Sequence, residues 1–580
     1  MKGPGRALVL GDDTRSFLAI VRSLGRAGVE VHVAPADFGS PALASRYVAA
    51  VHRLPPYLDI DGGAEWCDQV TALLRREGFD LVIPCDERTI LPFDRFREHF
   101  AGLARLALPD AAALAVLFDK EKTRELAAAC QVPLAPGRRV RPADNAASLI
   151  GEFGLPLVLK PAQSFRLGAL HARARVEIYQ YAAALTAALG DDSGVIKLAE
   201  GYFAGQGAGV SILASRGRVL QAFQHARARE RGGAGFYRVS RPLAADLLAA
   251  VERMAAAVAL TGIAMFEFKI AQPSGQWILL EVNARPWGSM PLAVALGVDF
   301  PMRWYRLLVA GEETPGVAYR AGIFGRNLMP DARQILAEAR ERRRHPIAMV
   351  RHLAGAAGEF GRLLVGREHL DVLVVDDPRP GLREFWQEGK GAAARLLQHW
   401  PGIRRWLAAR DLRTVRTVMQ RSRSGATILI MVCQGNICRS PVAAELLRRQ
   451  LAGRVPNLAV VAAGILPREG AASPQAARTA AEQLGVDLRS HRSQFFSEQM
   501  AAEAGLVVVF DQRNRVDILA RYPGLLRRTV MLGSFLGTPH STLEIGDPDG
   551  GNLATFERTY AVIARAVNAL AGFIEQSQPL

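Results

Sequence analysis

The chain has 580 residues, 49% of them hydrophobic, which predicts three or four domains, and it has no apolar run long enough to cross a membrane. Its five cysteines exclude a disulfide-stabilised scaffold and, with no signal-peptide pattern at the start, predict a cytoplasmic protein. The net charge of +16 favours anionic partners, but we expect no nucleic-acid partner because no recognition motif is present.

Residues 6–34 predict a strand, a helix and a second strand, the first unit of a Rossmann-like domain over residues 1–110. The turn Gly11-Asp12-Asp13 lacks the dinucleotide fingerprint, so we expect no dinucleotide there. A later buried strand ends before Asp86 and Glu87, at the kind of sheet edge where ligand sites form. These two acids could contact substrate or remain solvated.

Two lysines and two acids in residues 111–330 have the pattern of a nucleotide site. Lys120 follows Phe118-Asp119, and Lys160 ends an apolar strand. Farther on, the turn at Pro273-Ser274-Gly275 predicts a hairpin, and each of its strands carries an acid flanked by apolar residues.

The hairpin acids are Glu267 and Glu281, and Asn283 follows on the second strand. Carboxylate and amide oxygens facing one point suit a hard divalent cation such as Mg²⁺ bridging ATP phosphates. The alternative is an ordinary hairpin whose acids face solvent. Glu267 stands between two phenylalanines, which argues against that alternative, because a carboxylate there needs a partner.

This constellation resembles the ATP-grasp superfamily over about residues 1–330, with the carboxylate–amine ligases and the carbamoyl-phosphate-synthase-like proteins as the nearest types. The resemblance implies that ATP phosphates are held by Lys120 and Lys160, and that Glu200 lies in the adenine hinge. It also implies that Mg²⁺ is held by Glu267, Glu281 and Asn283, and that Arg285 stabilises the transferred phosphate or an acyl phosphate.

The basic stretch 224–240 lies between the nucleotide-binding strands and the metal-binding hairpin, a place that borders the acceptor site in the resembled fold. We expect its side chains to clamp a substrate carboxylate or phosphate, unless the stretch is a solvated mobile loop. The candidate residues are His225, Arg227, Arg229 and Arg231.

Residues 331–424 predict a helical, basic connector. Seven arginines stand between residues 401 and 424 against one acid, Asp411, while Trp400 and Trp406 give the stretch an apolar side. Packing between two enzymes is the favoured interpretation, and contact with an anionic membrane surface is the alternative. We expect a final linker at 422–425.

Residues 428–441 predict a strand, a tight loop from Cys433 to Arg439, and a helix with Ser440 as N-cap and Pro441 at its first position. Such a loop directs backbone N–H groups at one point, where they attract a phosphate and stabilise a thiolate. Arg439 adds a planar fork that matches two phosphate oxygens. The pattern is typical of a thiol phosphatase, against the alternative of a buried Cys with a surface Arg.

The sequence V-C-x-G-N-x-C-R-S-P resembles the signature loop of the low-molecular-weight protein tyrosine phosphatases, and the resemblance covers about residues 425–575. Further matching segments are Ala462–Gly464, His491–Gln494, Val507–Asp511 and Asp547-Pro548. The resemblance implies a central parallel sheet flanked by helices.

It also implies the roles of the site residues. Cys433 would be the nucleophile, Arg439 would bind phosphate, and Asp547 would be the general acid and base. The loop would be supported by Asn436, Ser440 and His491, while Cys438 would form a reversible disulfide with Cys433. Asp549 stands where relatives have an aromatic residue, and residues 465–473 contain none, so stacking of phosphotyrosine is in doubt.

The sequence thus predicts an α/β bifunctional enzyme with four segments, 1–110, 111–330, 331–424 and 425–580. One half would join a small-molecule carboxylate to an amine with ATP and Mg²⁺, and the other would hydrolyse a phosphoester or phosphoprotein. The first alternative is a phosphatase regulated by an ATP-grasp scaffold without turnover. The second is a binder of nucleic acid or of the inner membrane face through 331–424.

Overall fold

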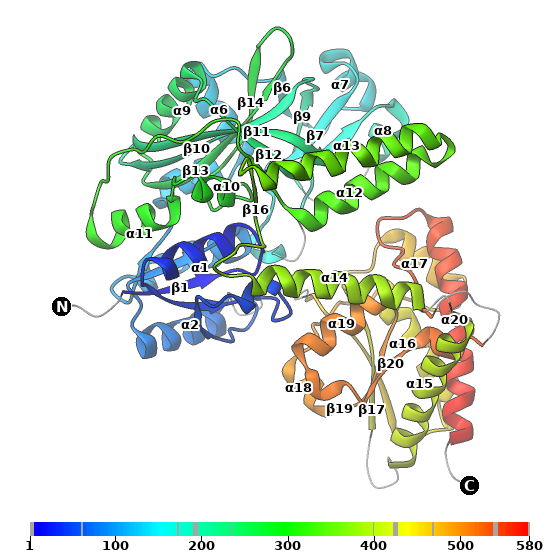
Figure 1. The fold of residues 1–580 in the computed structure, drawn as a ribbon. Coiled ribbons are helices and arrows are strands. Elements are labelled where there is room, and N and C mark those ends of the chain that lie inside the picture. Colours follow the sequence, from blue (N-terminus) through cyan, green and yellow to red (C-terminus); the bar gives the residue numbers. More distant parts are fainter. Residues whose placement is uncertain are drawn as a thin grey trace. The chain divides into compact units, whose positions relative to one another are not determined.

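The structure is a computed structural model of the whole chain, shown in Figure 1. It describes residues 5–59, 62–170, 173–189, 195–231, 234–397, 400–421, 427–466, 469–537 and 543–577. The chain divides into two compact units. The first comprises Met1–Ala36, Ser40–Pro55 and Glu65–Phe385, and the second comprises Asp37–Gly39, Pro56–Ala64 and Trp386–Leu580.

The first unit begins with a parallel five-stranded sheet in the order β3-β2-β1-β4-β5. Its strands are β1 Arg6–Leu10, β2 Glu30–Ala34, β3 Val48–Val51, β4 Leu81–Pro84 and β5 Arg105–Leu106. Its helices are α1 Ser16–Arg26, α2 Ala64–Glu77, α3 Glu87–Arg95 and α4 Arg97–Phe100. Four of the five residues of β1 are buried, as expected for a strand paired on both sides. The predicted Rossmann-like fold is confirmed.

A small antiparallel sheet follows in the order β6-β9-β7-β8. Its strands are β6 Gly137–Arg139, β7 Leu157–Pro161, β8 Glu177–Tyr179 and β9 Lys197–Gly201. The accompanying helices are α5 Ala111–Leu117, α6 Lys120–Ala129, α7 Ala146–Phe153 and α8 Ala182–Leu189. β7 is buried throughout and ends in Lys160-Pro161, so this lysine is held on a rigid strand.

The largest sheet has the order β14-β13-β10-β11-β12-β15-β16 and is antiparallel except for its last pair. Its strands are β10 Gln206–Ser215, β11 Arg218–Arg231, β12 Ala234–Arg241, β13 Gly262–Ile270, β14 Trp277–Asn283, β15 Phe324–Arg326 and β16 Glu368–Leu370. The helices around it are α9 Ala245–Ala257, α10 Met290–Ala295, α11 Phe300–Ala310, α12 Leu328–Glu341 and α13 Pro346–Leu364. The predicted hairpin is β13–β14, whose register pairs Glu267 with Glu281.

The second unit contains a parallel four-stranded sheet in the order β18-β17-β19-β20. Its strands are β17 Thr427–Cys433, β18 Leu458–Gly464, β19 Ala504–Val509 and β20 Thr529–Met531. The helices are α15 Pro401–Arg421, α16 Arg439–Leu451, α17 Gln475–Glu482, α18 Glu498–Glu503, α19 Gln512–Arg521 and α20 Leu553–Ser577. This arrangement confirms the predicted central parallel sheet flanked by helices.

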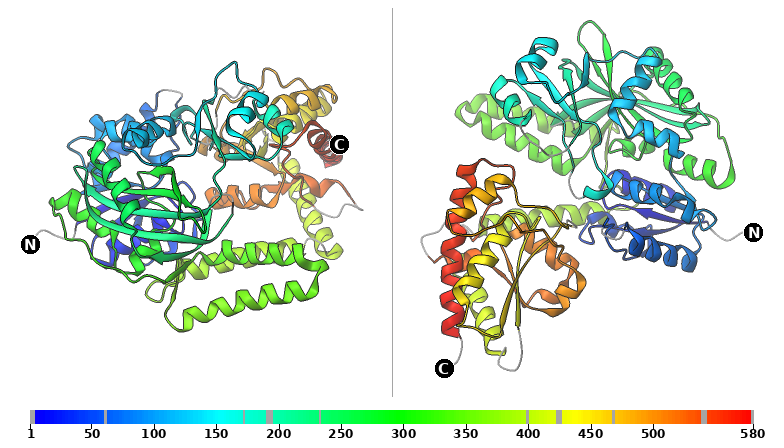
Figure 2. Two further views of the ribbon diagram at one scale, coloured as in Figure 1. Left: turned by 90° about the horizontal axis from the view of Figure 1, so that it is seen from above. Right: turned by 180° about the vertical axis from the view of Figure 1, so that it is seen from behind.

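The stretch 331–424, which the sequence predicts to be one connector, is divided between the two units. In the first unit, α12 and α13 lie side by side (Figures 1 and 2), and β16 extends the largest sheet. Buried Arg326 fixes this addition, because its guanidinium binds Asp331 and Glu368, each at 2.5 Å.

The helix α14, Arg379–Leu397, crosses the boundary between the units. In the second unit α15 packs on α20, and the buried carboxylate of Asp411 accepts hydrogen bonds from the Met531 backbone and the Ser534 hydroxyl. Among the described helices none is long and apolar enough to span a bilayer. The predicted linker at 422–425 lies outside the described residues.

Candidate active sites

In the second unit, Cys433 ends the central strand β17, and the loop 434–438 leads into α16. Asn436 adopts a φ of 53° in this loop, a left-handed conformation that asparagine tolerates better than most residues. Gly464 on β18 packs against the loop so closely that a Cβ there would lie 2.9 Å from the Gly435 carbonyl carbon. The strand, the turn and this close approach together hold the loop at the N-terminus of a helix, where anions bind.

Ser440 has a different position from the one predicted. α16 begins at Arg439, and Cys438 occupies its N-cap without a side-chain hydrogen bond. The Ser440 hydroxyl instead faces the loop, where it lies 3.1 Å from Cys433 Sγ and accepts a hydrogen bond from Asn436 Nδ2 at 2.9 Å. The predicted N-cap is therefore wrong, because this hydroxyl bonds to the loop and to the Ala463 carbonyl on β18, and not to the start of the helix.

Asn436 is held from three sides. Besides its bond to Ser440, its Oδ1 accepts from the Gln494 backbone N–H at 2.9 Å, and its carbonyl lies 2.7 Å from His491 Nε2. Burial lowers the pKa of His491, although its bond to the Asn436 carbonyl opposes this. The structure thus brings together the three residues expected to support the loop.

We predict that Ser440→Ala reduces kcat/KM for p-nitrophenyl phosphate about tenfold, because one hydrogen bond worth about 1.4 kcal/mol is lost beside Cys433. Steady-state kinetics of the full chain measures the effect. Ser577→Ala is the matched control, since that buried hydroxyl donates to the Phe573 carbonyl on α20, away from the loop. Equal kcat/KM for the two variants would refute a role for Ser440.

Arg439 connects the loop to two acids. Its guanidinium is 1% exposed and donates to Asp511 Oδ2 and Asp547 Oδ2, each at 2.6 Å. Burial alone would lower the pKa of Arg439, but the charges of Cys433, Asp547 and Asp511 raise it. The side chain of Asp547 is 40% exposed. A permanent cation and a solvent-accessible carboxylate therefore lie together beside the cysteine loop.

The second cysteine near the loop, Cys438, is buried next to Asp549 and Tyr560. Cys438 is buried, its Sγ lies 3.8 Å from Asp549 Oδ1, and its carbonyl accepts a hydrogen bond from Tyr560. Burial, followed by the charge of Asp549, raises the pKa of the Cys438 thiol. Cys433 and Cys438 are both free cysteines in the structure. The predicted disulfide between them stays a prediction.

In the first unit, a cavity of about 360 Å³ collects most of the residues expected to bind ATP and metal. It is lined by Lys120 of α6, Glu200 of β9, Glu281 and Asn283 of β14, and Arg285 shortly after β14, among other residues. Lys160 lines a second cavity of about 330 Å³ that shares the loop 163–166 with the first. Its Nζ lies 2.6 Å from Glu200 Oε2.

The side-chain amide of Asn283 lies near both acids of the hairpin, Glu267 and Glu281. Asn283 Nδ2 lies 3.4 Å from Glu267 Oε1 and 3.3 Å from Glu281 Oε1, while Arg227 binds the other oxygen of Glu267 at 2.5 Å. Burial raises the pKa of Glu267, and the charge of Glu281 adds to this while Arg227 opposes it. A divalent cation between the two carboxylates would remove their repulsion, so this donor set fits Mg²⁺.

The cations around the cavity have anionic or hydroxyl partners. Lys120 Nζ donates to Ser164 Oγ at 2.9 Å, and burial, with the charge of Lys160 contributing, lowers the pKa of this lysine. Arg285 Nε lies 3.0 Å from Glu87 Oε2. Burial alone would lower the pKa of Arg285, but Glu87 raises it.

Three of the four substrate candidates on β11 have described side chains, and these do not line the cavity. His225 is buried against Gly209, Arg227 pairs with Glu267, and Arg229 binds Asp331 at 2.7 Å and Glu359 at 2.8 Å. The side chain of Arg231 lies outside the described residues. Of the candidates whose side chains are described, Arg227 is the one that contacts a predicted metal ligand, Glu267.

Burial, together with Arg227 and Arg238, lowers the pKa of His225 to about 3. In the unfolded chain a histidine has a pKa of about 6.5, so below that pH the unfolded state binds a proton that the folded state does not bind. The contribution of His225 to stability is therefore complete above pH 6.5 and is lost as the pH falls toward 3. We predict that His225→Gln weakens the pH dependence of the free energy of unfolding. Between about pH 6.5 and 5, the slope of this free energy against pH should fall by up to about 1.4 kcal/mol per pH unit. Urea titrations between about pH 6.5 and 5 measure it, with His99→Gln as control. An unchanged slope would contradict the buried neutral state.

Comparison with known proteins shows the families. Residues 428–579 match the family model described as low molecular weight phosphotyrosine protein phosphatase. Over 142 residues the chain is 34% identical to the probable low molecular weight protein-tyrosine-phosphatase EpsP of Ralstonia nicotianae, covering 91% of that protein and 24% of this chain. The chain belongs to the low molecular weight protein-tyrosine-phosphatase family. The Etp phosphatase of Escherichia coli K12 is 30% identical over 141 residues, covering 88% of that protein and 24% of this chain.

Part of the first unit matches a second family model. Residues 197–323 match the model described as ATP-grasp in the biosynthetic pathway with Ter operon. Among solved structures, N5-carboxyaminoimidazole synthetase from Staphylococcus aureus in complex with ADP aligns over 60% of this chain and 87% of its own, with 14% identity and a TM-score of 0.46. By the two family models, the chain joins a segment that matches ATP-grasp proteins to a phosphatase domain, and both families are enzymes.

Sequence reasoning assigned no role to three residues at these sites. In the phosphatase domain, Asp511 binds Arg439 and also caps α19 through the Asn514 N–H. In the ATP-grasp domain, Arg124 binds Glu200 at 2.9 Å, and Ser164 binds Lys120. Arg124 could have been found, because it stands four residues after Lys120 and so shares its helix face. Asp511 comes two residues after the buried strand β19, which is a comparable signal.

Proposed function

We propose that this protein is a bifunctional enzyme, an ATP- and Mg²⁺-dependent carboxylate–amine ligase joined to a cysteine-dependent phosphomonoesterase. One observation supports the proposal most strongly: the groups needed for each reaction lie together within a single unit. Arg439, Asp547 and the Cys433 loop meet in the second unit. The paired acids, the lysines and Arg285 surround one region of the first.

In the phosphatase half, the phosphate of the substrate would occupy the loop 434–438, facing the guanidinium of Arg439. Cys433 would attack phosphorus as a thiolate, while Asp547 protonates the departing oxygen. The resulting phosphocysteine would be hydrolysed by a water molecule that gives its proton to Asp547. Ser440 would stabilise the thiolate by hydrogen bonding, and His491 would hold the loop through the Asn436 carbonyl.

In the ATP-grasp half, Glu267, Glu281 and Asn283 would hold Mg²⁺, which when bound neutralises charge on the phosphates of ATP. Lys120 and Lys160 would bind the same phosphates, and Arg285 would face the phosphoryl group being transferred. A substrate carboxylate would attack the γ-phosphorus and release ADP. An amine would then displace phosphate from the acyl phosphate, losing one proton to water.

The loop that carries Asp547 and Asp549 bears on which substrates the phosphatase domain accepts. Asp549 is exposed beside Asp547, and both stand in the loop next to Arg439. An acid at this position cannot stack on a tyrosyl ring as an aromatic side chain does. We therefore propose that phosphotyrosine is accepted when presented by a protein partner, and that small phosphoesters are hydrolysed without that selectivity.

The test is a pair of variants of the full chain. Cys433→Ser should lose phosphate-ester hydrolysis while substrate-dependent ADP formation continues, and Glu281→Gln should show the reverse. Loss of both activities in either variant would refute two separate active sites. ATP binding without ADP formation across a broad substrate pool would favour the alternative of a regulatory ATP-grasp scaffold.

A further inference from the structure

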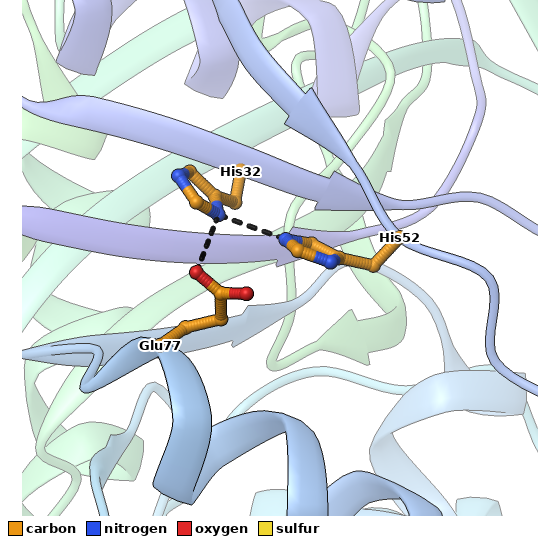
Figure 3. Close-up of side chains that lie close together, drawn as sticks. All are labelled: His32, His52 and Glu77. Atoms are coloured by element: carbon orange, nitrogen blue, oxygen red, sulfur yellow. Dashed lines mark hydrogen bonds and ion pairs between the residues drawn. The ribbon is translucent and has the colours of Figure 1, made fainter.

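A cluster of two histidines and a glutamate lies in the five-stranded domain, separate from the residues assigned to either active site. His32 stands on β2, His52 directly follows β3, and Glu77 ends α2 (Figure 3). Their ligating atoms lie within 4.8 Å of one another. We propose that this cluster is a binding site for a divalent transition metal, with Zn²⁺ as the best match.

The separations of the ligating atoms suit one metal ion. His32 Nδ1 lies 2.8 Å from His52 Nε2 and 3.9 Å from Glu77 Oε2. Ligand atoms of a tetrahedral zinc site, with bonds of about 2.0–2.1 Å, lie about 3.4 Å apart. The two distances bracket this value, so small side-chain rotations bring the three atoms into one coordination sphere. Imidazole with carboxylate is a ligand set that favours zinc over magnesium or calcium.

A second carboxylate orients the first histidine. His32 Nε2 lies 2.8 Å from Glu30 Oε1, so this ring nitrogen donates its proton there and leaves Nδ1 as a lone pair directed at His52 and Glu77. Metal-binding histidines are typically held in this way by a carboxylate on the ring nitrogen away from the metal. Arg6 in turn donates to Glu30 Oε2 at 3.1 Å, which fixes the carboxylate.

The other two ligands are also positioned. The backbone N–H of His52 donates to the Val33 carbonyl at 2.8 Å, and Phe79 packs edge-on against both imidazole rings. Glu77 receives a hydrogen bond from Arg76 on Oε1, and its Oε2 faces His32.

Three protein ligands leave a fourth position for water or an external ligand. The ligands come from β2, from the residue after β3 and from the end of α2, so a bound ion would tie the helix to the edge of the sheet. We therefore expect metal binding to stabilise the five-stranded domain, because an ion that binds only the folded state shifts the unfolding equilibrium. The proposal does not depend on the proposed ligase or phosphatase activity.

The test measures Zn²⁺ binding to the untagged, metal-stripped full chain, in a Cys433→Ser, Cys438→Ser background that removes the competing thiol pair. Competition with a chromophoric chelator should show one tight equivalent, and Zn²⁺ should raise the temperature of the first unfolding transition. His52→Ala and Glu77→Gln should each weaken this equivalent at least about 100-fold, and Glu30→Gln about 10- to 100-fold.

The matched control is His99→Ala, whose ring contacts Thr71 in the same domain and lies outside the cluster. It should bind Zn²⁺ as tightly as the background protein. Co²⁺ supplies a second readout, because a tetrahedral site with histidine ligands gives visible absorption that His52→Ala should lose. The proposal is overturned if the background protein binds no tight equivalent, or if His52→Ala and Glu77→Gln bind as the control does.

Discussion

Replacing Cys433 with serine is expected to reduce hydrolysis of p-nitrophenyl phosphate by at least about 10³-fold, leaving no activity above background. The serine hydroxyl remains protonated at neutral pH and cannot form the phosphocysteine. A serine side chain has nearly the size of a cysteine side chain. It should therefore fit the buried position at the end of β17, where Cys433 Sγ lies 3.1 Å from the Ser440 hydroxyl. Phosphate release from the purified full chain measures the effect.

Cys130→Ser is the control for this substitution, since that cysteine lies at the end of α6 in the other unit. It should retain full activity. Residual hydrolysis by Cys433→Ser above the background of the assay would exclude the thiol mechanism. Cys438→Ser separates the two cysteines of the loop: it should remain active but become more sensitive to irreversible oxidation by peroxide if the predicted disulfide forms.

Glu281→Gln is expected to reduce ATP turnover by at least about 100-fold, because it removes one of two charges that would hold Mg²⁺. The amide keeps the size of the side chain and can still bond to Asn283, so folding should persist. In the structure Glu281 faces Glu267 across the hairpin β13–β14 and lines the cavity that also contains Lys120 and Arg285.

The control is Glu252→Gln on the exposed face of α9. ADP formation at rising Mg²⁺ concentration distinguishes weaker metal binding, which extra Mg²⁺ partly overcomes, from a loss of fold, which it does not. Normal turnover by Glu281→Gln at low Mg²⁺ would remove this residue from the metal site.

Local patterns in the sequence were sufficient to predict the elements that carry the sites. The strand before Cys433, the hairpin with Glu267 and Glu281, and the first strand–helix–strand unit each have an apolar period or a turn signal that a single stretch displays. The placement of Lys160 at the end of a buried strand follows from the same kind of pattern.

Partners distant in sequence could not be predicted in this way. The basic stretch around His225 suggested a substrate clamp. However, β11 lies inside a seven-stranded sheet, and the side chain of His225 is buried there. Arg229 is drawn to Asp331 and Glu359 because residues 331–364 pack as helices beside that sheet. The sequence pattern of the basic stretch 331–424 predicts one connector. In the structure, ion pairs from Arg326 to Asp331 and Glu368 hold the first part of this stretch to the first unit.

The histidine cluster shows the same limit. His32, His52 and Glu77 stand twenty or more residues apart and match no metal-binding spacing, so only the parallel order β3-β2-β1 and the return of α2 bring them together.

The most direct test of the central claim is ADP and phosphate release by the Cys433→Ser protein, with ATP, Mg²⁺ and a pool of amino acids, amines and sugar acids. The inactive phosphatase cannot release phosphate from the products, so the count reports the ATP-grasp domain alone. A working ligase should form ADP in an amount that depends on added substrate, and the double variant Cys433→Ser, Glu281→Gln should lose this activity. ATP binding with no substrate-dependent ADP formation anywhere in the pool would contradict a working ligase.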